Sequence, residues 1–99
     1  MIIVNIYFQL VFDAVQPTLQ CPKTKQVKEG EKGIISCNFA GDPKPNITWK
    51  KEPQSGEVLS HKSTLVIDKV SIFDEGLYNI TANNGRTASA LVELEIICK

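Results

Sequence analysis

Apolar and polar residues alternate along this chain in short runs, and turn residues separate the runs every eight to twelve positions. From Gly33 to Ala40 the alternation places Ile35 and Phe39 on one face, and from Asn46 to Lys51 it places Trp49 on one face. A period of two residues is typical of half-buried strands, and no stretch shows the sustained spacing of a helix. The pattern predicts an all-β fold, an antiparallel β-sandwich of about seven strands.

The second half of the chain continues this pattern. Two further runs, 63–70 and 77–82, and a long last run, 88–96, each alternate between apolar and polar positions. Asn83-Asn84-Gly85 lies between the last two runs, and Asn-Gly readily adopts the positive φ angles of a type I′ turn. We therefore expect the last two strands to form a hairpin.

The sequence pattern that predicts the remaining strands is weaker. A short run that ends at Cys21 is bracketed by Pro17 and Pro22. Proline cannot donate a hydrogen bond to a sheet, so this run is expected to be a kinked first strand at an edge. Residues 52–62 are polar and predict a connecting loop, with a weak edge strand at Val58-Leu59.

Residues 1–16 are a separate part of the chain. Apolar residues fall on alternate positions from Ile2 to Phe12, which is strand periodicity. The stretch lacks an early Lys or Arg and a small-residue cleavage site, although a degenerate signal segment remains an alternative. It is too short and polar to insert directly into a membrane. We expect an extra N-terminal strand, or the remnant of a preceding domain, followed by one domain over residues 17–99.

Composition limits the functional classes. The chain has 99 residues, of which 42% are hydrophobic and 22% charged, and its formal net charge is zero. This length accommodates one domain, and the balanced charge gives no electrostatic reason to bind nucleic acid.

The cysteines and the histidine predict no metal or other cofactor. Cys21, Cys37 and Cys98 are an odd number, so at least one thiol stays free or pairs with another chain. No two of them have a zinc-ligand spacing, and His61 completes no familiar cluster with them.

A set of motifs in chain order carries a resemblance to a known family. The motifs are Gly30-Glu31, Cys37, Gly41-Asp42-Pro43-Lys44-Pro45, Trp49, Leu65-Val66-Ile67, Asp74-Glu75-Gly76-Leu77-Tyr78 and Asn84-Gly85. Together they resemble the immunoglobulin-like domains of the I-set and the related C2-type. The resemblance covers about residues 17–97 and implies a sandwich with Greek-key connections.

The resemblance also implies roles for individual residues. Trp49 is expected to fill the middle of the sandwich, and the hydroxyl of Tyr78 to bond back to the backbone as a tyrosine corner. Asp74 and Gly76 are expected to shape the turn before Tyr78. The expected structural core consists of Cys37, Trp49, Leu65, Tyr78 and Ile80.

The sequence departs from the family pattern at Ile80, where the family usually has a second inter-sheet cysteine. Cys37 is therefore expected to be a buried, inert thiol. Cys21 and Cys98 are expected to lie towards opposite ends of paired strands, too far apart for a disulfide. Both are candidate intermolecular thiols.

Two functions fit this domain. It is a non-catalytic binding or spacer module of an extracellular adhesion or receptor protein, or a load-bearing module of an intracellular muscle or cytoskeletal protein. The candidate N-glycosylation sites Asn46 and Asn79 fit the first function, and the missing cysteine at Ile80 fits the second. The expected partners are other protein domains, bound through the loops 42–45 and 83–86. No motif of a known enzyme class is present, so we expect no catalysis.

Overall fold

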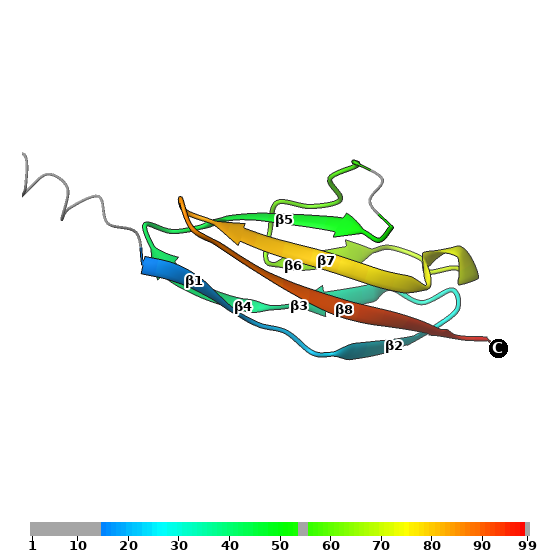
Figure 1. Cartoon of the computed structure of the whole chain (residues 1–99). Coiled ribbons are helices and arrows are strands. Elements are labelled where there is room, and N and C mark those ends of the chain that lie inside the picture. Colours follow the sequence, from blue (N-terminus) through cyan, green and yellow to red (C-terminus); the bar gives the residue numbers. More distant parts are fainter. Residues whose placement is uncertain (1–14, 54–55, 99) are drawn as a thin grey trace, which may run out of the picture.

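The structure, a computed structural model, describes residues 15–53 and 56–98 (Figure 1). Most of the strand predicted within residues 1–16 lies outside the described residues. The described strands are β1 (Val15–Gln20), β2 (Thr24–Lys28), β3 (Gly33–Ser36), β4 (Asn38–Asp42), β5 (Asn46–Lys51), β6 (Thr64–Ile67), β7 (Gly76–Asn83) and β8 (Thr87–Ile97), with one 3-10 helix, η1 (Ile72–Asp74).

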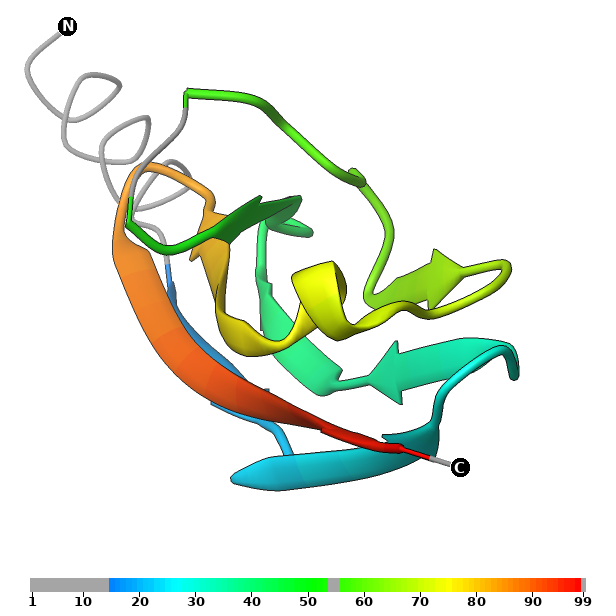
Figure 2. The same ribbon diagram turned by 90° about the vertical axis from the view of Figure 1, so that its right-hand side faces the viewer.

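The strands form two layers with a hydrophobic core between them. One layer is a four-stranded sheet in the order β2-β8-β7-β5. The other consists of the pairs β1-β4 and β3-β6, in which β3 and β4 are successive parts of one strand on either side of Cys37. Figure 2 looks along the strands and shows the layers facing each other. The predicted all-β sandwich is confirmed.

The first strand is divided between the two layers. β1 pairs antiparallel with β4, whereas β2 pairs parallel with β8 in the opposite sheet. The chain therefore crosses from one layer to the other between Gln20 and Thr24, at the kink that Pro22 predicts. This crossing brings Cys21 close to the middle of the sandwich.

The long hairpin of β7 and β8 is confirmed, but its turn differs from the expected type. Residues 84–86 connect the strands, and among the described residues only glycines have positive φ angles, Gly85 having a φ of 104°. A type I′ turn needs a positive φ at two successive central residues, whereas a three-residue connection needs it at one. The side chain of Asn84 bonds within this turn, where its Oδ1 accepts from the amide of Arg86 at 3.2 Å, and its Nδ2 donates outside it.

The weak edge strand expected at Val58-Leu59 is reduced to one bridge on β5. The amide of Leu59 donates to the carbonyl of Trp49 at 2.8 Å, and the amide of Trp49 donates to the carbonyl of Ser60 at 3.0 Å. These two bonds occupy the outer backbone edge of β5 at Trp49.

Candidate functional site

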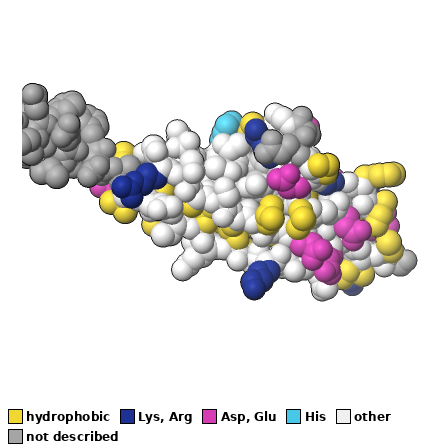
Figure 3. Space-filling model, viewed as in Figure 1, with side chains coloured by type: hydrophobic (Ala, Val, Ile, Leu, Met, Phe, Trp, Pro, Cys, Tyr) yellow, Lys and Arg dark blue, Asp and Glu magenta, His cyan; other side chains and the backbone are white. Residues whose placement is uncertain are grey.

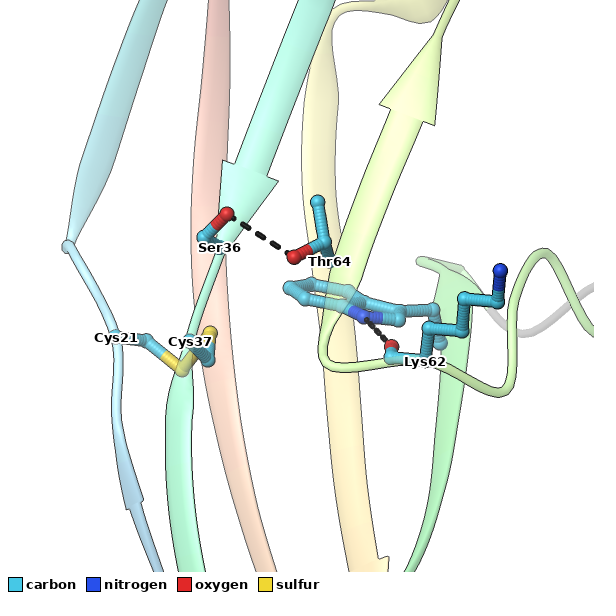
Figure 4. The surroundings of a disulfide bond; sticks show 6 residues. Cys21, Ser36, Cys37, Lys62 and Thr64 are labelled. Carbon is cyan, nitrogen blue, oxygen red and sulfur yellow. Dashed lines mark hydrogen bonds between the residues drawn. A yellow bond between two sulfur atoms is a disulfide. The ribbon is translucent and has the colours of Figure 1, made fainter.

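The side chains expected in the core meet around Trp49. Trp49 and Ile80 are fully buried and lie opposite each other on β5 and β7. The indole Nε1 of Trp49 donates to the backbone carbonyl of Lys62 at 2.9 Å, so burial leaves its one polar atom satisfied (Figure 4). Leu65, Tyr78 and Cys37 are also buried in the same cluster. Trp49 thus packs in the core between the two layers and is hydrogen-bonded to the loop before β6.

Cys37 is not a free thiol, because it forms a disulfide with Cys21 (Figure 4). The two Cα atoms are 4.5 Å apart, and the half-buried Cys21 packs against the core. The expectation of an inert thiol at Cys37 is therefore wrong, and so is that of an intermolecular thiol at Cys21. The expectation that Cys21 does not bond to Cys98 is correct, and Cys98 is free and exposed.

The error came from assigning one partner to the whole first strand. Leu19 pairs with Phe39 and Gln20 with Asn38, so one further step in this register brings Cys21 opposite Cys37. A Cα separation of about 4.5 Å is that of closely spaced partners in an antiparallel pair. The sequence shows the two cysteines, but the antiparallel pairing of β1 with β4 that brings them together is seen only in the structure. Ile80 meanwhile fills the place of the family's second cysteine.

The turn before β7 is held by Tyr78 and Asp74. The hydroxyl of Tyr78 donates to the backbone carbonyl of Asp74, four residues earlier. The carboxylate of Asp74 in turn accepts from the amide of Ser71 at 2.8 Å. Burial, with a smaller contribution from the nearby charge of Asp74, raises the pKa of Tyr78 to about 12. We assign this corner a structural role, because the Tyr78 hydroxyl and the Asp74 carboxylate both form hydrogen bonds within the turn.

Gly76 follows this turn with a φ of 146° and pairs with Leu94. A Cβ built on Gly76 would lie 3.3 Å from Cε of Lys51, whose ammonium donates to the carbonyl of Phe73 at 2.6 Å. The positive φ and this close contact both favour glycine.

The two glycosylation sequons lie on neighbouring strands of the four-stranded sheet. Their threonines, Thr48 and Thr81, are direct cross-strand partners. Asn46 is exposed, whereas Asn79 is half-buried and its amide donates to Glu52 at 3.4 Å. The Asn46 side chain is therefore the more accessible acceptor.

The two loops expected to bind partners lie at the same end of the molecule. The side-chain amide of Asn84 donates to the carbonyl of Pro43 at 3.0 Å and to that of Val15 at 2.7 Å. One side chain therefore joins the loop after β7, the loop after β4 and the start of β1.

No cluster of three or more His, Cys, Asp or Glu side chains that could hold a metal ion occurs within residues 15–53 and 56–98. The described part of the chain also contains no helix with the length and hydropathy to cross a membrane.

Residues 16–84 of the chain match the model of the immunoglobulin domain family. Among curated proteins the chain is similar to the protein amalgam of Drosophila melanogaster, at 38% identity over 65% of the chain and 20% of that protein. It is 35% identical, over 91% of the chain, to 10% of the MAM domain-containing glycosylphosphatidylinositol anchor protein 1 of Rattus norvegicus. It is also 35% identical, over 69% of the chain, to titin of Drosophila melanogaster, of which the match spans under 1%. The chain thus spans a fifth or less of these relatives.

Solved structures show the same fold. The four N-terminal immunoglobulin domains of Dscam1 isoform 6.9 match with a TM-score of 0.72 and 25% identity, over 85% of this chain and 22% of that one. The match to one part of a four-domain chain agrees with the single sandwich seen here.

Proposed function

The chain belongs to the immunoglobulin-domain family, and we propose that it is a non-catalytic binding or spacer module of a larger extracellular adhesion or receptor protein. Its partners in this proposal are other protein domains. The fold by itself names no ligand, because immunoglobulin sandwiches carry many functions.

The disulfide between Cys21 and Cys37 carries this proposal. Disulfides form and persist in oxidising compartments and are rare in the cytosol, where thiols are kept reduced. The bridge lies within one chain and joins the end of β1 to the start of β4 in the same layer, so it acts as a structural bond. A domain that relies on this bond is suited to the cell exterior.

Two further observations support the extracellular placement. Asn46 is an exposed acceptor within a sequon, as expected of a domain that passes through the secretory pathway. One relative bears a glycosylphosphatidylinositol anchor in its name, and this anchor attaches proteins to a membrane surface.

The similarity to titin favours a second candidate, a load-bearing module inside the cell. The absence of the family's usual cysteine at Ile80 agrees with that candidate. The disulfide weighs against it, because it would be reduced in the cytosol. We therefore place the intracellular scaffold second.

The test is an intact-mass measurement on protein secreted from animal cells, before and after enzymatic removal of N-glycans, with a count of free thiols. We expect one free thiol, at Cys98, and glycan mass that Asn46→Gln removes to a greater extent than Asn79→Gln. Three free thiols in a folded, unglycosylated product would contradict the proposal and favour the intracellular scaffold.

A further inference from the structure

An open groove of about 840 Å³ lies beside the start of β5. Its wall comes from Phe39 on β4, the nearby residues 44–48, and the loop at 61–63, which is more distant in sequence.

The charges along this groove have one sign. Lys44 and Lys62 line it together with the imidazole of His61, and no Asp or Glu is among the described residues that line it. The side chain of Lys62 extends away from the bond that its carbonyl makes with the indole (Figure 4). On the face seen in Figure 3, most acidic side chains gather towards the end at which β8 ends. The charged side chains that line this groove are therefore cationic, on a chain with no formal net charge.

The other groups in the groove suit a sugar. The half-buried Phe39 provides apolar surface, and Asn46, Thr48 and Ser63 provide amide and hydroxyl groups. Amides and hydroxyls both donate and accept hydrogen bonds, which matches the hydroxyl groups of a carbohydrate. Ammonium groups form charge-assisted hydrogen bonds with anionic oxygens.

The backbone in the groove argues against an acidic peptide added as a strand. Strand addition needs free backbone groups at a sheet edge. The carbonyl of Ile47 already accepts from Nδ1 of His61 at 3.2 Å. The amide and carbonyl of Trp49 are bonded to Ser60 and Leu59. The accessible polar groups are thus side chains rather than a strand edge.

We propose that this groove binds a sulfated oligosaccharide when Asn46 carries no glycan, with Lys44 and Lys62 contacting sulfate groups and the amide and hydroxyl side chains contacting the sugar. The proposal rests on the extracellular placement above only for the source of the ligand, because sulfated glycans occur at cell surfaces. Binding itself is a property of the purified domain.

The test uses the domain from bacterial periplasm, where the disulfide can form and Asn46 carries no glycan. A heparin-derived hexasaccharide is titrated into ¹⁵N-labelled protein while amide chemical shifts are followed. We expect the shifts to cluster at residues 44–48 and 61–63, and the double variant Lys44→Gln, Lys62→Gln to bind roughly tenfold more weakly. A matched control, Lys28→Gln with Lys32→Gln, removes two charges outside the groove and is expected to change the affinity by less than about twofold.

Three outcomes would overturn the proposal. These are no binding, equal weakening by the control pair, and equal binding of a fully desulfated hexasaccharide. An oligoglutamate peptide that binds more tightly than the sulfated sugar would identify an acidic peptide site instead. A thiol count of three would contradict the proposed function without affecting this titration, whereas one free thiol without sugar binding would reject the groove alone.

Discussion

At the scale of single residues, the polar groups near the core are satisfied within the protein. Trp49 and Tyr78 each bring one hydrogen-bonding atom to the core boundary, and each donates it to a backbone carbonyl. Burying such an atom without a partner would cost free energy comparable to a lost hydrogen bond. Both residues therefore specify backbone positions in addition to filling space.

Tyr78 predicts how the stability of the domain depends on pH. Its pKa is raised to about 12 in the folded state from an ordinary value of 10.0. Because the folded pKa is the higher one, the contribution of Tyr78 to stability is fully present below pH 10. It is lost as the pH rises from about 10 to about 12, since the unfolded chain releases this proton first.

Urea melts at several pH values test this prediction against Tyr78→Phe, which keeps the ring and removes the hydroxyl. We expect the difference in unfolding free energy between the two proteins to shrink from pH 10 to pH 12. Subtracting the unfolding free energy of the variant at each pH removes the effect of lysines, which ionise in the same pH range in both proteins. A difference that stays constant would show that the hydroxyl ionises normally in the folded domain.

At the scale of elements, the disulfide anchors the point at which the first strand crosses from one layer to the other. Cys21 lies between β1 and β2, and Cys37 lies between β3 and β4. The antiparallel pair β1-β4 and the parallel pair β2-β8 therefore meet at one covalent bond. This bond lies within the β1-β4 side of the sandwich, whereas the inter-sheet bond of the family would join the opposite layers.

Replacing Cys21 with alanine tests this arrangement, because it removes the bond and keeps Cys37 in the core. The sequence separation of 16 residues predicts a stability loss of about 3 kcal/mol from the freed chain. We expect amides of β1 to exchange with solvent faster than those of β2, which stays paired with β8.

The control is Cys98→Ala, which removes an exposed free thiol and is expected to leave the denaturant midpoint unchanged. If Cys21→Ala has no larger effect than this control, the disulfide does not stabilise the domain.

At the scale of the whole molecule, one small core serves both sheets. Trp49 from one layer and Leu65 from the other belong to the same cluster of buried side chains. A chain of this size buries only about two thirds of its unfolded surface, so the loss of one large side chain affects the entire fold.

We therefore predict that Trp49→Ala lowers the unfolding free energy by about 3–5 kcal/mol, because it leaves a cavity at the contact between the layers. Denaturant melts followed by circular dichroism measure this loss. Val66→Ala, at an exposed strand position, is the control and is expected to have a much smaller effect. A loss below about 1 kcal/mol for Trp49→Ala would mean that the core does not depend on this side chain.

The sequence by itself determined the strand pattern, the sandwich and the family. Alternation is a local property that fixes which face each residue presents, so Trp49, Leu65 and Ile80 could be assigned inward from their neighbours alone. The order of the motifs from Gly30-Glu31 to Asn84-Gly85 then identified the family.

Only the tertiary structure decided which segments lie side by side. The pairing of Cys21 with Cys37 depends on the first strand crossing between layers, and the alternation of either strand does not encode that crossing. The cationic groove likewise requires Lys44 and Lys62, from two separate loops, to converge beside β5. Both features are long-range contacts set by strand pairing, and that is the physical reason why local patterns could not predict them.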